Sequence, residues 1–555
     1  MRRITLAGAL LALSPLLQAA GSDADVDRLL AARLDGDRTG ACVQAAVIEP
    51  GQVWRARRCA GTRADGPPAA DAAFEIGSVS KTMLAALVAG LVDSGRWSLD
   101  DAVARHLPAG TDVPRQGERQ ILVRDLLTHA SGLPVLPADL QGGTQADPYA
   151  RLTEAGLLAS LGKARLTRAI GSQAEYSNFG TMVLSVAVAR SLGGNLEAAL
   201  REQLFQPLGM ATAYIAKPGR AAPATGHLPD GSPAPAWTIA TNLAGVGMVK
   251  ATLDDMVGYA RGQLGDGPPA LVARLQRTQQ PLAHGFGMNW LLQQAQGRSL
   301  VLHEGGTGGF SSLVMLEPAS RRAVVLLADT SLTDIGGLGD LGAALLGLPV
   351  PLQPRRAVDT PPALRQALAG DYTLGAMTLT IRDADGRLTV QAPGQPAFEL
   401  RRDSRGDFYP LGLPALLRPE PPAPGQPVAR FTWHQLGGVT PARRVGLVEA
   451  PPSISNPAWR DWAGEFELAP QFSLKVFERE GQLMVQGSGQ PAIAATAAGT
   501  DRIEVPAVGA VVEFERDAGG RVVAAVLKQG GRSLRGPLRA AVPAPSAASR
   551  APSDR

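Results

Sequence analysis

The sequence predicts an α/β (α+β) domain built on one antiparallel sheet, followed by two small antiparallel β domains. Runs of alternating apolar and polar residues, which are typical of strands, occur at the start and at the end of residues 22–348. Helical segments lie between these two sets of strands. After residue 363 the sequence contains short strand-like runs separated by Gly and Asp turns. Since early and late strands would share one sheet, we expect the helices to flank it and to form a separate helical lobe.

The first predicted strands are residues 41–48 and 53–60, joined by a turn at Pro50–Gly51. In a symmetric hairpin around that turn, Cys42 lies directly opposite Cys59, and cross-strand neighbours are within reach of a disulfide. A slip of one residue would separate the two sulfur atoms. The sequence therefore indicates either a disulfide or two buried free thiols.

Helices follow the hairpin, and strands return at the end of the first region. Thr252 and Asp255 form a capping-box pattern that opens one of these helices. The predicted helices are 80–94, 121–129, 153–161, 179–192, one beginning at 252, and 340–346; the predicted strands are 285–292, 299–303, 310–316 and 322–328.

Proline-rich stretches divide the chain. We expect a signal peptide at 1–21, a catalytic domain at 22–348, a linker at 349–363, small β domains at 364–448 and 456–540, and a disordered tail at 541–555. The two β domains share an internal repeat, because matching strings recur at matching offsets: Gly386–Gln391 with Gly481–Gln486, Gln395–Pro396 with Gln490–Pro491, and Gly370–Tyr372 with Gly464–Phe466.

Charge and the N-terminus limit the class of protein. The net charge is +4 over 555 residues, with scattered arginines, so we expect no nucleic-acid partner. Arg2 and Arg3 precede the apolar residues 4–17 and the small residues 19–21, which is typical of a signal peptide. The alternative is an uncleaved anchor, but the apolar stretch is short for a bilayer core of about 30 Å. We therefore predict a periplasmic or secreted protein with no membrane span after signal removal.

Ser78 and Lys81 form the first candidate catalytic element. Residues three apart share one face of a helix, so the two side chains can be within hydrogen-bond reach. A lysine desolvated in the apolar segment that follows can act as the base that activates the serine hydroxyl. By itself Ser-x-x-Lys is a common pattern, and the alternative is a capping serine followed by a surface lysine.

Two further elements complete the candidate site. Tyr176 precedes a predicted helix and can relay a proton, while Asn178 can donate to a substrate carbonyl and accept from Lys81; the alternative is a packed tyrosine and an Asn cap. The run His303, Glu304, Gly305 and Gly306 ends a predicted strand. Glycines there allow close approach of a ligand, and the N–H groups of Gly306 and Ser78 could form an oxyanion hole; the alternative is a hairpin turn.

Taken together, the three elements resemble the superfamily of serine β-lactamases, penicillin-binding proteins and esterases, whose motifs are Ser-x-x-Lys, Tyr-x-Asn and Lys/His-x-Gly. The pattern is most similar to class C β-lactamases and D-aminopeptidases. Residues 74–81, 126–134 and 205–210 add to the resemblance. It implies a β-lactamase-like fold, Ser78 as nucleophile, Lys81 and Tyr176 as base and acid, and Asn178 as a residue that orients the substrate.

The third motif departs from that of class C β-lactamases, which carry Lys-Thr-Gly. A histidine attracts a substrate carboxylate less than a lysine does, and Glu304 would repel one if it points inward. If Glu304 faces the far side of the sheet, the second argument fails. His-x-Gly is similar to D-aminopeptidases, D-amino-acid amidases and some esterases; D-aminopeptidases also carry two small β-barrel domains after the catalytic domain.

Three functions remain open. The first is a serine hydrolase of small amide, D-amino-acid peptide or ester substrates. The second is a true β-lactamase or penicillin-binding DD-carboxypeptidase that accepts β-lactams, and the third is a catalytically silent ligand-binding protein of the cell envelope. We expect no metal and no other cofactor, because four further histidines of the catalytic region lack metal-ligand spacing and are interpreted as structural: His106, His129, His227 and His284.

Overall fold

The structure is a computed structural model. It describes residues 20–61, 66–138, 140, 143–144, 146–217, 221–375, 377–422, 425–435, 438–447, 457–470, 472–479, 481–488, 490, 492–529 and 532–539. The expected signal peptide, apart from its last two residues, and the expected tail lie outside these residues. Within them, no helix is both long and apolar enough to cross a membrane.

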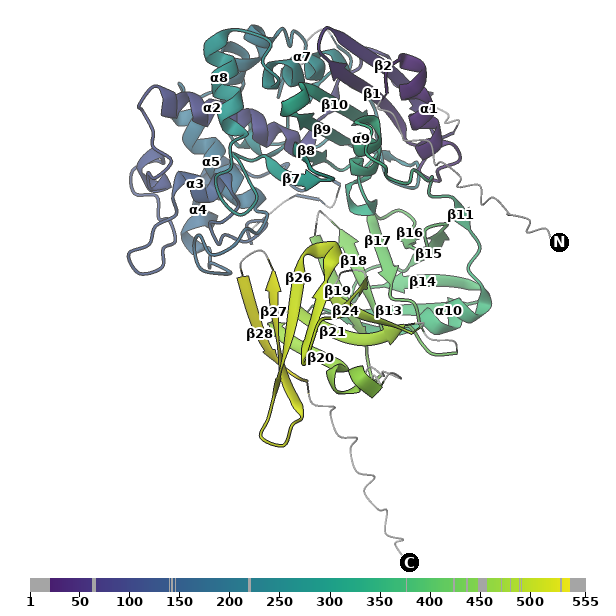
Figure 1. Ribbon diagram of the computed structural model, residues 1–555. Helices are drawn as coiled ribbons and strands as arrows, with labels where there is room; N and C mark the ends of the chain where they lie inside the picture. The colour runs from purple at the N-terminus through teal and green to yellow at the C-terminus, as the bar shows by residue number, and fades with distance from the viewer. Residues whose placement is uncertain are drawn as a thin grey trace, which may run out of the picture. The chain divides into compact units, whose positions relative to one another are not determined.

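The first region is built on a six-stranded antiparallel sheet in the order β2-β1-β10-β9-β8-β7, so the first and last strands of the region do share one sheet. Figure 1 shows these strands side by side. The strands are β1 (Cys42–Glu49), β2 (Gln52–Cys59), β7 (Leu291–Ala295), β8 (Arg298–Gly306), β9 (Ser311–Glu317) and β10 (Arg322–Ala328).

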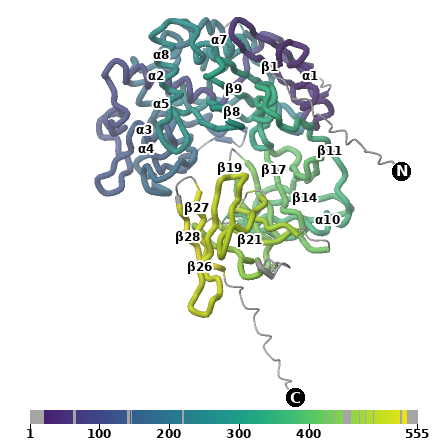
Figure 2. The backbone as a smooth tube through the Cα atoms, in the orientation of Figure 1, coloured from purple at the N-terminus to yellow at the C-terminus, as the bar shows by residue number. Residues whose placement is uncertain are grey.

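Helices cover both faces of this sheet. Alternate residues of β1 enter two different cores: Ala46 and Ile48 pack on the helical-lobe side, whereas Val43, Ala45 and Val47 pack under α1 and α9. Figure 2 shows the backbone path of α3, α4 and α5 within the helical lobe. The helices are α1 (Asp23–Leu34), α2 (Ser80–Asp93), α3 (Val123–Leu127), α4 (Glu154–Lys163), α5 (Asn178–Ser191), α6 (Leu196–Leu200), α7 (Leu253–Gln263), α8 (Pro269–Thr278) and α9 (Gly339–Leu345).

Most predicted elements occur within a few residues of their expected bounds, and the capping box of Thr252 and Asp255 opens α7. One prediction is wrong: the strand expected at 285–292 begins only at Leu291. The two residues just before β7 are anchored by side-chain hydrogen bonds instead: Asn289 donates to the Lys81 carbonyl, and the Trp290 indole donates to Thr278. Asn289 has a φ of 57°, in the left-handed region, and this conformation interrupts a strand. Helices α1, α6 and α8 were not predicted.

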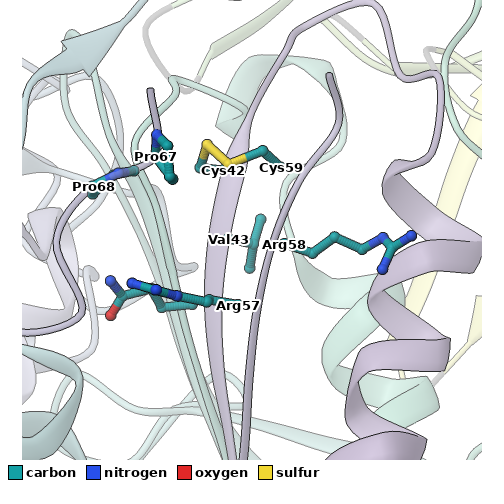
Figure 3. A pocket seen from close by; sticks show the side chains of 8 residues that line it. Cys42, Val43, Arg57, Arg58, Cys59, Pro67 and Pro68 are labelled. Atoms are coloured by element: carbon teal, nitrogen blue, oxygen red, sulfur yellow. A yellow bond between two sulfur atoms is a disulfide. The ribbon is translucent and has the colours of Figure 1, made fainter. Parts of the chain in front are cut away.

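The hairpin has the predicted symmetric register. Cys42 pairs with Cys59, and the two form a disulfide. Figure 3 shows the disulfide bridging the two strands beside a cavity of about 270 Å³, which Pro67 and Pro68 also line. None of the three candidate catalytic motifs lines this cavity.

The first β repeat is an eight-stranded antiparallel barrel. Its strands run in the order β15-β14-β13-β12-β19-β18-β17-β16, and β16 also pairs with β15, which closes the ring. A short strand, β11 (Ala357–Val358), extends β15, and α10 (Pro362–Leu368) precedes the barrel. The barrel strands are β12 (Gly370–Leu374), β13 (Met377–Ala384), β14 (Arg387–Gln391), β15 (Phe398–Asp403), β16 (Phe408–Pro410), β17 (Ala415–Pro419), β18 (Arg430–Gln435) and β19 (Gly438–Arg444).

The second β repeat follows the same plan with two sheets, β20-β21-β22-β23 and β24-β25-β26-β27-β28, bridged between Phe466 and Leu538. Equivalent contacts recur: Gln391 donates to the Gln395 carbonyl, and Gln486 donates to the Gln490 carbonyl, each at 3.0 Å. Its strands are β20 (Gly464–Ala469), β21 (Phe472–Arg479), β22 (Gln482–Gly487), β23 (Ile493–Ala494), β24 (Thr496–Ala497), β25 (Arg502–Val505), β26 (Ala510–Arg516), β27 (Val522–Gln529) and β28 (Arg532–Pro537).

The compact units differ from the expected domain boundaries, because most of both β repeats falls in one unit and one segment of the first repeat belongs to the catalytic unit. Arg401–Leu416, which lies inside the sequence of the first β repeat, packs with residues up to Asp359 as part of the catalytic unit. Its attachment is a buried ionic cluster in which Arg355 donates to Asp403 at 2.9 Å and to Asp407 at 2.8 Å. This segment was expected to be part of a separate domain, and sequence spacing does not reveal such a long-range ion cluster.

Candidate active site

Ser78 lies in a 3-10 turn (Gly77–Val79) that leads directly into α2. Gly77 has a φ of 50°, and a Cβ at this position would lie 2.4 Å from the backbone nitrogen of Gly306. Only glycine fits there, because it combines the left-handed conformation with the closest approach of β8. Two side-chain hydroxyls fix the turn: Ser80 donates to the Gly77 carbonyl at 2.8 Å and Ser312 to the Ile76 carbonyl at 2.7 Å.

Lys81 points from the first turn of α2 onto Ser78. Its Nζ is 2.8 Å from Ser78 Oγ and 2.5 Å from the carbonyl oxygen of Val246. The side chain is fully buried among apolar residues of α2, and this desolvation places the pKa of Lys81 well below its ordinary value. Desolvation therefore disfavours the protonated amine, and the deprotonated form is the one that can accept the proton of the serine hydroxyl.

Tyr176 lies close to both Ser78 and Lys81. Its hydroxyl is within hydrogen-bonding reach of Ser78, and Lys81 Nζ is 4.9 Å from the centre of its ring. Desolvation raises the pKa of Tyr176, although 38% of the residue surface remains exposed. The phenol thus keeps its proton at neutral pH and can pass it to a leaving group. Ser78, Lys81 and Tyr176, which were predicted from separate motifs, are brought together.

Asn178 is the first residue of α5, and the helix cap is Ser177, whose Oγ accepts from the Gly180 N–H at 3.0 Å. The Asn178 side chain is hydrogen-bonded to Tyr149. Its Oδ1 is buried and accepts no hydrogen bond from any described residue. No hydrogen bond to Lys81 is found within the described part of the chain, so the expected contact between these two side chains is replaced by one to Tyr149.

The third motif occupies an open stretch of strand edge. β7 pairs with β8 only as far as Leu302, so the edge beyond it is free to face the Ser78 turn. A Cβ at Gly305 would lie 2.0 Å from the Ile76 carbonyl oxygen, which shows how closely strand and turn approach. The backbone nitrogen of Gly306 consequently lies beside the nucleophile turn, as an oxyanion hole shared with Ser78 requires.

His303 faces the catalytic side of the sheet. Its cross-strand partner Val314 belongs to the core of the helical lobe, and its ring lies 6.4 Å from that of Tyr176. Burial lowers the pKa of His303 to about 3, and the nearby Lys81 acts in the same direction. The Nδ1 atom is 2.6 Å from the carbonyl oxygen of Glu304. His303 is therefore neutral at physiological pH and supplies no fixed positive charge to the site.

Glu304 points away from the site, which removes it from the predicted substrate-binding set. Its cross-strand partner Leu313 belongs to the core under α1 and α9, on the opposite face from His303. The backbone of Leu338 and Gly339, at the start of α9, hydrogen-bonds to its carboxylate. Because neighbouring residues of a strand face opposite sides, only one of His303 and Glu304 can contact a substrate.

Sequence reasoning missed three contributors to this site. The carbonyl of Val246 contacts Lys81 from 165 positions away, and a backbone atom carries no sequence signal. Tyr149 orients Asn178 from a loop without a motif. His129, which was interpreted as structural, lies against Tyr176 with a distance of 4.5 Å between ring centres. Its position within a family-like stretch was the available signal.

Comparisons with known proteins agree with this geometry. The family model described as Beta-lactamase matches residues 26–344. Penicillin-binding protein 4 of Amycolatopsis lactamdurans is 31% identical over 333 residues, which cover 54% of this chain and 84% of that protein. D-alanyl-D-alanine-carboxypeptidase/endopeptidase AmpH of Escherichia coli K12 is 27% identical, covering 49% and 75%. Esterase EstB of Burkholderia gladioli is 33% identical, covering 33% and 50%.

The matched residues include all three motifs, and the folded geometry unites the serine, the lysine and the tyrosine around one turn. The remaining part of the chain, with its two β repeats, lies beyond the family match. The chain belongs to the β-lactamase family and is a serine hydrolase of that family.

Proposed function

We propose that this protein is an exported serine hydrolase that cleaves small amide, D-amino-acid peptide or ester substrates through an acyl-enzyme on Ser78. The observation that carries the proposal is the 2.8 Å contact between Ser78 Oγ and a fully buried Lys81 whose pKa is lowered by desolvation. A neutral amine at that distance is a competent general base for a serine hydroxyl.

Acylation follows from the arrangement. Lys81 accepts the hydroxyl proton as Ser78 Oγ attacks the substrate carbonyl carbon, and the N–H groups of Ser78 and Gly306 stabilise the resulting oxyanion. Tyr176, which is protonated because burial raises its pKa, donates a proton to the leaving amine or alcohol and is reprotonated from Lys81. Hydrolysis of the acyl-enzyme uses the same groups in reverse, with water as the nucleophile.

Substrate choice is argued from charge. A β-lactam or a D-Ala-D-Ala peptide carries a carboxylate, and a cation is the group that would hold it most strongly. His303 is neutral because its pKa is about 3, and Glu304 contributes nothing because it faces α9. The exposed edge of Tyr176 instead offers an apolar surface. These features favour substrates in which the leaving group bears no carboxylate, such as amides and esters.

A second function, penicillin-binding DD-carboxypeptidase or β-lactamase, is favoured by the names of two relatives, penicillin-binding protein 4 and a D-alanyl-D-alanine-carboxypeptidase. Under this proposal, hydrogen bonds rather than an ion pair would hold the carboxylate.

The test is intact-protein mass spectrometry of the mature protein after mixing with a fluorophosphonate, with p-nitrophenyl butyrate, or with benzylpenicillin, and Ser78→Ala is the control. We expect fluorophosphonate labelling and ester turnover in the wild type, neither of them in Ser78→Ala, and little benzylpenicillin adduct. A long-lived penicillin adduct would favour the second function. Absence of fluorophosphonate labelling in the wild type would favour a catalytically silent binding protein.

Export is proposed from the charged and apolar N-terminal pattern and from the Cys42–Cys59 disulfide, which is stable in an oxidising compartment. Fractionation of cells expressing the full chain, followed by N-terminal sequencing of the periplasmic or secreted product, tests it. Cleavage near Ala19–Gly21 supports export, whereas an intact N-terminus in the cytoplasmic fraction contradicts it.

A further inference from the structure

His129 follows α3 in a backbone conformation that is rare for its residue type. Its φ is 55°, in the left-handed region, and the residue is only 2% exposed. A non-glycine residue held in this region is strained by roughly 1–3 kcal/mol and persists where the surroundings over-determine it. Several of the contacts of His129 involve the tyrosine of the active site or the residues next to it in the chain.

His129 accepts two hydrogen bonds from the residues that flank Tyr176 in the chain. The carbonyl oxygen of His129 accepts from the Glu175 N–H at 2.8 Å, and the imidazole Nδ1 accepts from the Ser177 N–H at 3.3 Å. The residues immediately before and after Tyr176 are therefore bound to the same histidine. Such a pair of contacts restricts both backbone angles that set the direction of the Tyr176 side chain.

The imidazole also supports the phenol ring directly. The two ring centres are 4.5 Å apart with a tilt of 35° between the planes, and Phe286 packs edge-on against the imidazole at 5.5 Å between ring centres. The tyrosine has 38% of its surface exposed, so this contact is one of the supports of a ring that is otherwise open to the substrate side.

The hydrogen bond to Ser177 fixes the protonation of the imidazole. Because Nδ1 accepts an N–H, a neutral His129 carries its proton on Nε2, and this buried Nε2 has no hydrogen-bond partner among the described residues. A second proton would destroy the Ser177 contact and would place a cation near Lys81 and His303. The neutral Nε2–H form is the one that fits.

We propose that His129 is a positioning residue for Tyr176. It keeps the phenol directed at Ser78 by accepting hydrogen bonds from the backbone of Glu175 and Ser177 and by packing against the ring. The inference deepens the proposed function, since it rests on Tyr176 acting as the proton relay. It predicts a loss in the chemical step with little change in substrate binding.

The experiment compares two variants that both tolerate a left-handed backbone. His129→Asn keeps an acceptor at the position of Nδ1 but loses the ring, and His129→Gly loses both. His284→Asn is the matched control, because His284 has a φ of 53° and its Nε2 contacts the Gly171 carbonyl at 3.1 Å. With p-nitrophenyl butyrate, we expect kcat to fall about tenfold in His129→Asn and about 100-fold in His129→Gly, the scale of a misplaced catalytic group, at similar KM.

A double-mutant cycle distinguishes positioning from general destabilisation. If His129 acts through the phenol, His129→Asn added to Tyr176→Phe lowers kcat no further, because the relay has already been removed. Full additivity of the two losses would overturn the proposal. Failure of the wild type to hydrolyse the ester at all would count against the proposed function and not against the contact between His129 and Tyr176.

Two NMR measurements on the folded protein test that contact without using activity. With ¹³Cζ-tyrosine labelling, six tyrosines give few signals, and Tyr176→Phe assigns the one of interest. We expect this signal to shift and broaden in His129→Gly and to stay unchanged in His284→Asn; an unchanged signal in His129→Gly would overturn the proposal. Should the glycine variant not fold, ¹⁵N-histidine spectra of the wild type decide instead: a proton on Nδ1 of His129 would be incompatible with the Ser177 contact.

Discussion

Two regions of the catalytic unit bury charged side chains, and they do so in opposite ways. Around Arg355, burial is matched by pairing: the guanidinium is 2% exposed and contacts the carboxylates of Asp403 and Asp407, which are 0% and 4% exposed. Around Lys81, burial is complete, but no carboxylate lies within ion-pair distance of Nζ in the described part of the chain. Among the described residues, Lys81 Nζ is hydrogen-bonded to the Ser78 hydroxyl and the Val246 carbonyl and lies over the Tyr176 ring.

The difference shows that the free-energy cost of burying a charged group can lead to two different outcomes. A buried charge that is paired stays charged and attaches one segment to another, as Arg355 attaches Arg401–Leu416. In a buried amine without a counter-ion the protonated form is disfavoured instead, and its pKa moves down toward the range needed for a base. The first arrangement contributes structure, and the second contributes reactivity at some cost in stability. Each can be altered separately.

The largest expected effect comes from Lys81→Met, which keeps the shape of the side chain and removes the base. We expect kcat/KM for p-nitrophenyl butyrate to fall by roughly 10²–10⁴, the range for loss of a general base. The thermal midpoint should stay the same or rise, because an apolar group replaces a desolvated amine. Lys163→Met, on the exposed last turn of α4, is the control for loss of a lysine as such. Near-normal turnover in Lys81→Met would transfer the base role to another group.

Arg355→Met should do the reverse, with stability lost and chemistry retained. The change removes the arginine that donates to both buried carboxylates, although Asp403 keeps its contact with Arg38 at 3.6 Å. Breaking a buried pair costs about 3–5 kcal/mol. Urea denaturation should show the lower midpoint, while kcat of the folded fraction stays near that of the wild type. Arg55→Met is the matched control, because the pair of Arg55 and Asp254 is 45% and 82% exposed and should contribute at most about 1 kcal/mol.

The same cluster bears on any shortened form of the protein. Ending the chain near Gly347 would remove Arg355, Asp403 and Asp407 together, along with Tyr409, whose ring lies 3.3 Å from the buried guanidinium carbon of Arg38. Arg38 would then be left in the catalytic unit without two of its contacts. A shortened chain that expresses poorly would therefore say nothing about the role of the β repeats in catalysis, and point variants such as Arg355→Met are the better probe.

The next prediction concerns the pH dependence of folding stability, because His303, close to Lys81 and Tyr176, has a lowered pKa. Its pKa is about 3 in the folded protein and ordinarily about 6.5, so between these values the unfolded chain binds a proton that the folded chain does not. Folding stability contributed by this group is therefore fully present above about pH 6.5 and falls by about 1.4 kcal/mol per pH unit below it. Urea midpoints measured between pH 7 and pH 4 should fall less steeply in His303→Asn than in the wild type. Parallel slopes would show that His303 is protonated in the fold.

The comparison also separates what the sequence could predict from what it could not. Ser78 and Lys81 lie three residues apart on one helix, so their contact follows from local geometry, and the turn at Pro50–Gly51 is enough to pair Cys42 with Cys59. The cluster around Arg355 joins residues 48 and 52 positions apart, and no local pattern marks it. The contact between Lys81 and the Val246 carbonyl could not be predicted either, because a backbone carbonyl has no sequence signature.

The orientation of Glu304, which faces the core under α1 and α9, could be predicted only in part. Alternation along a strand requires His303 and Glu304 to face opposite sides, and this much was expected. Which of them faces the serine depends on the register of β8 with β9, where Val314 and Leu313 belong to different cores. Sequence spacing shows which residues of a strand share a face. When both faces are buried, it does not show which face is directed toward the active site.

The smallest expected effect tests whether the charge of the third motif sets substrate choice. His303→Lys would place an amine on the catalytic face, where it can meet a substrate carboxylate, and a charge-assisted hydrogen bond contributes about 1.5–3 kcal/mol. Lys81 and the burial of the site oppose the charged form of the new residue. We therefore expect only the lower end of this range, about a tenfold faster acylation by benzylpenicillin relative to p-nitrophenyl butyrate, followed by mass spectrometry. Glu304→Gln is the control and should change neither rate, because its carboxylate is bound at the start of α9. A larger effect from Glu304→Gln than from His303→Lys would reverse the assignment of the two side chains and would make the acidic residue, rather than the neutral histidine, the one that excludes carboxylates.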